Sequence, residues 1–264
     1  SVPIGIAAIM NQVYFHFDLL TLGFMKTEID VGLYNAAFKI VTFLLTIDTA
    51  FAWVYFPMVS RFSKKSKEKM KTLVNESAKF IAILVVPLAF GGTVLAGRVI
   101  NVIYGARFLG ASTALRILIW AIPLTSLQSI FAFGLLGCDR EKKYSIGMVI
   151  GTLTNIVLNL ILIPFLGIKG AAIATIVSEV VMLYVMARWF KEILFVPFYK
   201  FLLKPLLATI VMLIVIIILW KIATLPIIFI SICVYIFTLL ALKGISKNDL
   251  KLIRGEYGDI YRNS

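Results

Sequence analysis

Uninterrupted apolar segments of about 20 residues recur along the whole chain and constrain its fold more than any other feature. A helix needs about 20 apolar residues to cross the hydrocarbon core of a bilayer. Of the 264 residues, 61% are hydrophobic and 15% are charged, whereas a water-soluble domain is about half apolar and about a quarter charged. The sequence therefore predicts an all-α, polytopic membrane protein, because the short alternating segments of transmembrane strands do not occur.

Hydropathy in windows of about 19 residues predicts eight transmembrane helices. They run approximately over residues 2–25, 33–60, 77–97, 113–136, 144–166, 170–190, 201–220 and 225–242. A short interfacial helix is expected over 99–108, with a turn at Gly105. The Lys-rich segment 61–76 is expected to be the longest interior connector between spans.

The positive charge of the chain is concentrated beside the spans. Lys and Arg account for 26 residues and Asp and Glu for 13, which gives a net charge of +13. Most of the cations lie in alternate connectors and in the tail after residue 243, with few aromatic residues between them. The positive-inside rule makes these connectors and both ends cytoplasmic. We therefore expect a multi-pass protein of the cytoplasmic membrane whose cations set topology and meet anionic lipid, and no nucleic-acid partner.

The first residues of the chain indicate whether the sequence is a segment of a longer protein, and its motifs indicate whether it is an enzyme. The first span lacks the basic segment and the cleavage site of a signal peptide, and it contains polar residues. Because Ser1 is not an initiator Met, we expect a segment of a longer protein. No P-loop, GxSxG, HExxH or paired-Cys motif occurs, and His16 is the only histidine. We expect no enzyme, no metal site and no bound organic cofactor.

Three predicted helices carry a polar residue at one depth. Asp18 and Asn159 each lie seven residues before the outer end of an outward-running span, and Thr175 lies five residues inside the next span. At about 1.5 Å per residue, all three lie about 8–10 Å below the outer boundary. Asn155 precedes Asn159 by one turn, and Glu179 follows Thr175 by one turn. These oxygens suit a cation or proton site, and hydrogen bonds that only join helices are the alternative.

The second predicted span carries a polar stripe at i, i+4, i+7 and i+11 spacing, formed by Asn35, Lys39, Thr42 and Thr46. Such a stripe is typical of a helix that faces a water-filled cavity. A Lys in the stripe suits an anionic substrate, and the alternative is that its side chain extends to the outer interface. Asp48 lies about half a turn from Lys39 around the helix, so the two cannot pair on the same helix.

A stretch from Thr154 to Glu179, TNIVLNLILIPFLGIKGAAIATIVSE, resembles the N-x3-N, LIP and G-x2-GAA-x-AT signature of polysaccharide exporters. Further matches are DLL at 18–20, VGLYNAAFK at 31–39, FPMVSR at 56–61 and IYGARF at 103–108. Over roughly residues 1–200, the chain resembles the multidrug, oligosaccharidyl-lipid and polysaccharide (MOP) flippase superfamily. Within it, the chain resembles O-antigen flippases in particular.

The resemblance implies a domain organisation. Such flippases have two lobes of six helices, often followed by two more helices. Residues 1–200 would form the C-terminal six-helix lobe, residues 201–243 the two additional transmembrane helices, and residues 244–264 a cytoplasmic tail. The other lobe would lie in N-terminal sequence of the same polypeptide that is missing here.

The resemblance also implies a cation site. Related peptidoglycan-precursor flippases bind sodium through side chains and one carbonyl on three helices. The matching positions are Asp18, Asn155, Asn159, Thr175 and the carbonyl of Ala171. Asn159 stands where those flippases have an Asp, which removes one negative charge. Lys39 matches an Arg that faces the substrate diphosphate, and a Lys would contact phosphate as a point charge.

The implied function is export of a polyprenyl-diphosphate-linked oligosaccharide across the cytoplasmic membrane by alternating access, coupled to a cation or a proton. Lys39, assisted by Arg116, would compensate the diphosphate in a cavity between the lobes. A cation-coupled multidrug exporter of the same superfamily is one alternative, which needs an acidic cavity. A membrane-embedded glycan polymerase or ligase is the other, which needs a large external loop.

Overall fold

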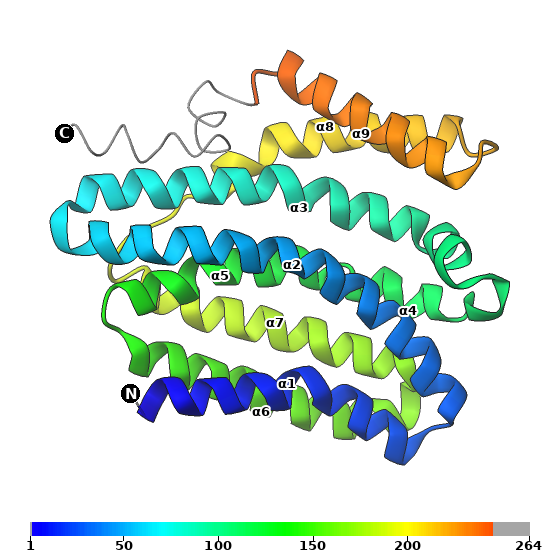
Figure 1. The fold of residues 1–264 in the computed structure, drawn as a ribbon, viewed down its shortest axis with the longest axis horizontal. Coiled ribbons are helices and arrows are strands. Elements are labelled where there is room, and N and C mark those ends of the chain that lie inside the picture. Colours follow the sequence, from blue (N-terminus) through cyan, green and yellow to red (C-terminus); the bar gives the residue numbers. More distant parts are fainter. Residues whose placement is uncertain (1, 245–264) are drawn as a thin grey trace.

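The computed structural model describes residues 2–244, and within that range its regular secondary structure consists of helices alone, which confirms the predicted all-α class. The helices lie along one long axis, and successive long segments alternate in direction, with α4 and α5 continuing in the same direction (Figure 1). Their bounds are α1 Val2–Met25, α2 Glu28–Lys65, α3 Lys67–Tyr104, η1 Ala106–Phe108, α4 Ala111–Leu118, α5 Ala121–Gly137, α6 Glu141–Leu166, α7 Ile168–Phe190, α8 Tyr199–Ile218 and α9 Thr224–Ala241.

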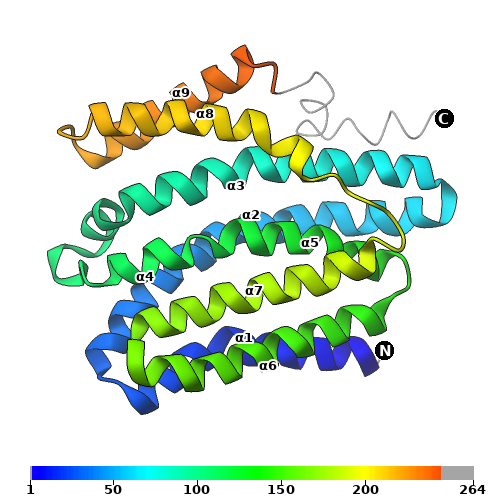
Figure 2. The ribbon, with the colours of Figure 1, turned by 180° about the vertical axis from the view of Figure 1, so that it is seen from behind.

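The helices form one continuous bundle. Helix α6 packs against both α1 and α7, and α5 packs against both α2 and α7. The α8–α9 hairpin lies on the far side of α3, away from α1 and α6, in both opposite views (Figures 1 and 2). The core of the bundle is therefore shared by α1 to α7, and α3 separates it from the hairpin.

Seven helical segments of the described chain are long and apolar enough to cross a membrane, with α4 and α5 counted together. Helix α1 is the eighth long helix, with 24 residues. It falls outside that group because Asn11, Gln12, His16 and Asp18 lower its hydropathy. The eight predicted spans thus correspond to the eight long helical segments, and the break at Ile119 and Trp120 divides one of them into α4 and α5.

The connector expected over 61–76 is helical apart from the break at Ser66. Helices α2 and α3 each have 38 residues, or about 57 Å of helix, which is longer than a bilayer core. They continue through the Lys-rich segment because Lys, Glu, Met and Leu are strong helix formers. The chain reverses at Ser66, whose side chain accepts a hydrogen bond from Lys69 N at 3.3 Å as the N-cap of α3.

The predicted interfacial helix over 99–108 is wrong. Residues 99–104 are the last part of α3, which ends at Gly105. Gly105 has a φ of +84°, a left-handed conformation that favours glycine, so the predicted turn at this position is confirmed. Only the three residues of η1 follow it before α4 begins.

The turn between α1 and α2 sets the position of the first two helices. Thr27 caps α2: its side chain accepts a hydrogen bond from Asp30 N, and the Asp30 carboxylate accepts one from Thr27 N. Lys26 Nζ donates to the carbonyl of Pro164 in α6 at 2.9 Å. The ends of α1, α2 and α6 at this turn are therefore held together just beyond the predicted cation site.

The α8–α9 hairpin is attached to α3 by a small apolar cluster and by polar contacts at two levels. Tyr235 OH donates to the carbonyl of Ile83 at 2.7 Å. The Arg98 guanidinium lies 4.1 Å from the centroid of the Trp220 ring and donates to the carbonyls of Trp220 and Ile222. The division into a lobe over 1–200 and two helices over 201–243 stays a prediction, and the predicted tail from 245 onward lies outside the described residues.

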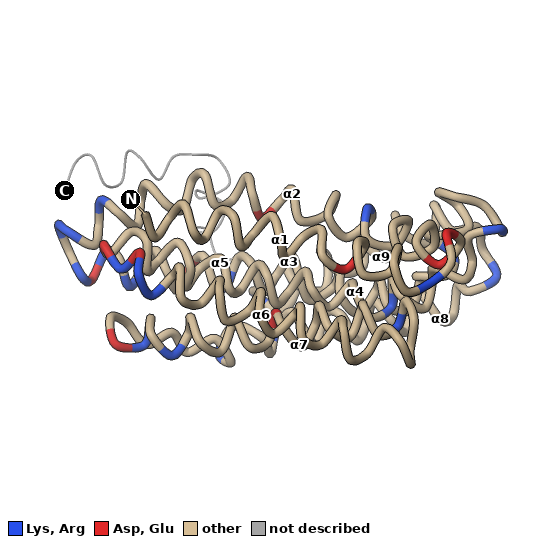
Figure 3. Tube along the Cα trace, turned by 90° about the horizontal axis from the view of Figure 1, so that it is seen from below, with Lys and Arg blue, Asp and Glu red and all other residues tan. Residues whose placement is uncertain are grey.

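The described charges gather at the two ends of the bundle (Figure 3). The N-terminus lies at the same end as the Lys-rich turn between α2 and α3 (Figure 1). Between the two ends the helices carry few charged residues, and several of those are acidic. The placement of Lys and Arg at helix ends agrees with the distribution expected for a membrane bundle.

Gly170→Ala is expected to destabilise the packing of α6 against α7. A Cβ at this position would lie 2.5 Å from the carbonyl oxygen of Leu162, and backbone cannot move aside as a side chain can. We expect the free energy of unfolding to fall by about 1–2 kcal/mol, measured by denaturant titration in detergent. Gly32→Ala is the matched control, since a Cβ there meets nothing within 4 Å. An equal effect of both changes would contradict this account.

Candidate functional site

The structure brings Asp18, Asn159 and Thr175 together, as their predicted depths require. Asn159 Nδ2 donates to Asp18 Oδ1 at 2.5 Å, and Thr175 Oγ1 donates to Asp18 Oδ2 at 2.7 Å. All three side chains are buried. The Asp18 carboxyl therefore joins α1, α6 and α7 inside the bundle, at the depth where an ionisable group requires partners.

Tyr34 of α2 is a fourth member of this cluster, which the sequence analysis missed. Its hydroxyl donates to Asp18 Oδ2 at 2.7 Å and lies 3.4 Å from Thr175 Oγ1. The side chain is fully buried. A tyrosine inside a predicted span is a usable signal, because a buried phenol needs a hydrogen-bond partner. We call Asp18, Tyr34, Asn155, Asn159 and Thr175 the Asp18 cluster.

The other two predicted ligands also lie at the Asp18 cluster. Asn155 Oδ1 accepts a second hydrogen bond from Asn159 Nδ2 at 2.9 Å, and the Ala171 carbonyl lies 3.1 Å from Thr175 Oγ1. Asn159 Oδ1 is buried and has no hydrogen-bond partner among the described residues. The cluster thus offers a carboxylate and an unpaired amide oxygen, a donor set that fits a hard cation or a proton held by the carboxyl.

Glu179 lies beside the Asp18 cluster, one turn further along α7. Tyr14 OH donates to Glu179 Oε1 at 2.9 Å, and both side chains are buried. A small cavity of about 20 Å³ is lined by Asp18, Thr175 and Glu179 together with Thr42 of α2. This cavity is large enough for about one water molecule. The small cavity therefore lies next to both the Asp18 and the Glu179 carboxyl groups.

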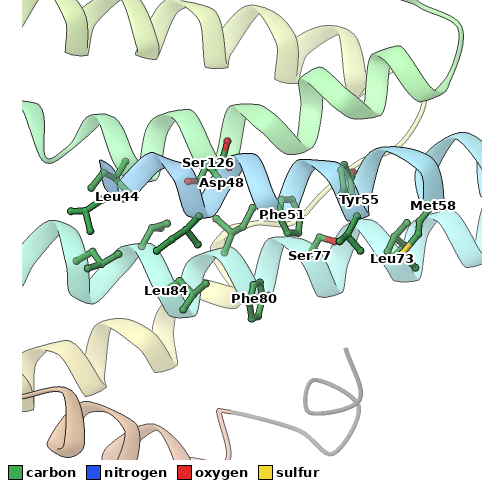
Figure 4. A pocket seen from close by; sticks show the side chains of 16 residues that line it. Leu44, Asp48, Phe51, Tyr55, Met58, Leu73, Ser77, Phe80, Leu84 and Ser126 are labelled. Atoms are coloured by element: carbon green, nitrogen blue, oxygen red, sulfur yellow. The ribbon is translucent and has the colours of Figure 1, made fainter. Parts of the chain in front are cut away.

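A larger cavity of about 470 Å³ begins at Glu179 and lies between α1, α2, α5, α6 and α7. Asp48 of α2 lines it, and Ser129 Oγ of α5 donates to Asp48 Oδ2 at 2.6 Å. Asp48 and Ser126 also line an apolar groove of about 330 Å³ between α2 and α3 (Figure 4). Asp48 therefore lies where this larger cavity and an apolar groove adjoin. We call the larger space the Glu179 cavity.

The predicted phosphate and stripe residues lie outside the Asp18 cluster. Lys39 and Arg116 are exposed, and neither has a hydrogen bond or ion pair within the described part of the chain. Asn35 is half-buried, and Thr46 is exposed and donates to the carbonyl of Phe43 at 2.6 Å. Of the stripe, the structure thus places Thr42 beside the small cavity and leaves the Lys39 side chain accessible.

No group of three or more His, Cys, Asp or Glu side chains within residues 2–244 is placed to hold a metal ion. The predicted Asp18, Asn159 and Thr175 side chains are brought together, whereas Asp48 and Ser129 were not predicted as a pair. The arrangement provides two buried carboxyl groups, Asp18 and Glu179, on either side of a small cavity. Lys39 lies exposed on the polar stripe of α2.

Comparison with known proteins identifies the lineage of this bundle. A family model described as polysaccharide biosynthesis protein matches residues 1–113. The probable low-salt glycan biosynthesis flippase Agl15 of Haloferax volcanii is 28% identical over 194 residues, which is 73% of this chain and 41% of that protein. The chain is similar to MOP-type polysaccharide flippases. This confirms the resemblance drawn from the sequence motifs, and the resemblance to O-antigen flippases in particular stays a prediction.

Solved flippase and transporter structures share the fold. The lipid II flippase MurJ in an inward closed conformation has a TM-score of 0.72 and 22% identity, over 90% of this chain and 51% of that one. An outward-facing MATE multidrug transporter of the MOP superfamily has a TM-score of 0.65 and 18% identity, over 83% and 53% of the two chains. The chain is thus a multi-pass membrane protein that spans about half the length of each of these proteins.

Proposed function

We propose that this chain is the lobe of a flippase that moves a lipid-linked oligosaccharide, with a polyprenyl diphosphate as the lipid carrier, across the cytoplasmic membrane. The observation that carries the proposal is the Asp18 cluster, which lies beside a polar cavity in a chain related to glycan flippases. The activity is transport and not catalysis. The termini of the described segment face the cytoplasm, in accordance with the Lys-rich turn at that end.

A second lobe of the same polypeptide supplies the opposite wall of the transport path. The relatives are roughly twice as long as this chain, and the exposed face of α1 and α2 adjoins the Glu179 cavity. The substrate enters between the two lobes from one side of the membrane and leaves on the other. Alternating access then requires two arrangements of the lobes with different affinity for the substrate or the coupling ion.

The Asp18 cluster couples this change of arrangement to a sodium ion or a proton. The carboxyl of Asp18, the free Asn159 Oδ1 and the Ala171 carbonyl would hold the ion, and the hydroxyls of Tyr34 and Thr175 orient the carboxyl. Because the cluster joins α1, α2, α6 and α7, a change in its charge alters contacts on four helices. An ion bound there biases one arrangement only if it binds that arrangement more tightly.

Lys39 holds the diphosphate of the substrate, with Arg116 as a second cation. Both side chains are exposed and unpaired in the described chain, so neither is already neutralised by a carboxylate. Lys39 follows the Asp18-bonded Tyr34 by five residues on α2. Phosphate binding on α2 can therefore act on the same helix that contacts the carboxyl of Asp18.

Lys39→Ala is expected to slow translocation of the lipid-linked oligosaccharide about tenfold, since a charged hydrogen bond contributes about 1.5–3 kcal/mol. Lys39→Arg should keep most of the activity because it preserves the charge. The measurement is flipping of a fluorescent polyprenyl-diphosphate glycan by the full-length protein in proteoliposomes. Lys169→Ala, a change of another exposed Lys, is the matched control. Full activity of Lys39→Ala would refute the phosphate role.

A second candidate function is export of organic cations, as expected of a MATE-type member of the superfamily. The specific observation in its favour is that Asp48 and Glu179 line the Glu179 cavity, with no Lys or Arg among the lining residues. A cationic substrate would be attracted to such a wall. Efflux of a fluorescent organic cation by the full-length protein, without flipping of the glycan lipid, would establish this function in place of the first.

A further inference from the structure

The Glu179 cavity presents three hydrogen-bond acceptor atoms without a partner at hydrogen-bond distance. Glu179 Oε2, Asp48 Oδ1 and Gln128 Oε1 are all buried and have no hydrogen-bond partner within the described residues. Gln128 and Glu179 are only 8% and 5% exposed. Unpaired buried acceptors are costly, so a native site of this kind calls for a ligand or ordered water that donates. We call Asp48, Gln128 and Glu179 the acceptor wall.

The acceptor wall differs from the Asp18 cluster in how its carboxyl groups are satisfied. Both oxygens of Asp18 accept hydrogen bonds from protein side chains. Glu179 and Asp48 each use one oxygen for a close protein donor, Tyr14 or Ser129. The hydroxyls of Thr125 and Ser126 also interact with these carboxyls, and the second oxygen of each has no partner at hydrogen-bond distance within the described residues. The protein donors fix the orientation of each carboxyl. The second oxygen of each is thereby available to a group inside the cavity.

Aromatic side chains surround the acceptor wall. The cavity is lined by Tyr14, Phe15, Trp53, Phe56, Phe133 and Tyr144. Flat apolar surfaces combined with a few fixed polar groups are the usual composition of a small-molecule site. A sugar ring matches this combination, because it has apolar faces of C–H bonds and a rim of hydroxyl donors. The volume of about 470 Å³ is within the range of about 300–1,000 Å³ found for ligand pockets.

The charge of the residues that line the Glu179 cavity suits the sugar part of the substrate and not its diphosphate. No Lys or Arg lines the Glu179 cavity, so a diphosphate or a carboxylated sugar would meet two acidic side chains without a compensating cation. Lys39 points outward on the adjoining stripe of α2 and is available to the diphosphate. The cavity thus suits an uncharged group that donates hydrogen bonds and disfavours an anion.

We propose that the Glu179 cavity binds neutral, hydroxyl-bearing sugar units of the lipid-linked glycan, and that the acceptor wall discriminates against acidic sugars such as uronates. This inference rests on the proposed flippase function and adds a specificity site to it. A site built to accept hydrogen bonds from hydroxyl groups rejects a ligand that cannot donate them, because its own polar groups are then left unpaired.

The test compares two substrates in proteoliposomes that contain the full-length protein. One is a polyprenyl-diphosphate glycan with neutral sugars, and the other carries a uronate at the same position. The double variant Asp48→Asn with Glu179→Gln should lower the ratio of neutral to acidic glycan flipping about tenfold. The matched control is Asp139→Asn with Glu192→Gln, which changes two exposed carboxylates outside the cavity. The control should leave the ratio unchanged.

Trp53→Ala supplies a second variant that does not disturb the core. Trp53 is 78% exposed in the described chain, so its removal costs little packing. It should slow flipping of both glycans, whereas Trp53→Phe should retain the rate by keeping an aromatic face. Normal rates for Trp53→Ala would count against a sugar ring stacked in the cavity.

Three results would overturn the inference. Wild-type protein that flips no glycan lipid at all would remove the proposed function and this inference with it. Glycan flipping with an unchanged neutral-to-acidic ratio in the double variant would remove this inference alone. Loss of organic-cation efflux in the double variant, with glycan flipping intact, would assign the acceptor wall to a cationic ligand.

Discussion

Replacing Asp18 with Ala is expected to lower the free energy of unfolding by about 2–3 kcal/mol, because a buried hydrogen-bond network loses its central acceptor. Tyr34 would keep only its 3.4 Å contact with Thr175. Thr175 can turn its hydroxyl to the Ala171 carbonyl, and Asn159 keeps its bond to Asn155. The loss is therefore concentrated on the Tyr34 hydroxyl and on the space that the carboxyl occupied.

Denaturant titration of the purified protein in detergent measures this loss. Tyr34→Phe is the graded comparison, since it removes one donor and leaves Asp18 bonded to Asn159 and Thr175, and it should cost about 1 kcal/mol. Glu192→Ala, a change of an exposed carboxylate paired with Lys143, should stay within about 0.5 kcal/mol of wild type. Wild-type stability for Asp18→Ala would show that the Asp18 cluster does not hold the four helices together.

Replacing Asp18 with Asn is expected to preserve the fold and reduce translocation roughly 100-fold, near the upper end of coupling free energies between sites. The hydroxyls of Tyr34 and Thr175 can still donate to the remaining oxygen. The side-chain amides of Asn159 and Asn155 can both turn over, so that Asn159 Oδ1 accepts hydrogen bonds from the new NH2 group and from the previously unpaired Asn155 Nδ2. The number of hydrogen bonds is thus retained, while the negative charge and the protonatable group are lost.

The two readouts for Asp18→Asn are flipping in proteoliposomes and unfolding in detergent. Asp139→Asn is the matched control, because Asp139 is an exposed carboxylate whose φ of +56° an Asn also adopts readily. Wild-type flipping by Asp18→Asn would exclude both sodium and proton coupling at this carboxyl. A loss of flipping accompanied by an equal loss of stability would reassign Asp18 to a purely structural role.

Depth in the membrane could be predicted from the sequence, because helical rise converts residue number into distance along the axis. Asp18, Asn159 and Thr175 meet in the structure for that reason. The helical class followed from hydropathy in the same direct way. The residues that face a neighbouring helix depend, in contrast, on the rotation of each helix about its axis.

That rotation explains what the sequence analysis missed. Tyr34 reaches Asp18 because the Thr27 cap sets where α2 begins, and Asp48 faces Ser129 because α2 packs on α5. Neither contact can be predicted from the spacing of residues along a single helix. The lengths of α2 and α3 were underestimated for another reason: hydropathy marks the part of a helix inside the bilayer, whereas helix propensity carried both beyond it as far as Ser66.

The α8–α9 hairpin is attached to the bundle at a place separate from the Asp18 cluster. The hairpin packs mainly on α3, through Tyr235 and the Arg98 contact with Trp220, while the Asp18 cluster draws on α1, α2, α6 and α7. A substitution in the hairpin can therefore reach the Asp18 cluster mainly through α3. We expect changes at the α8–α9 interface to leave the contacts among α1, α2, α6 and α7 in place.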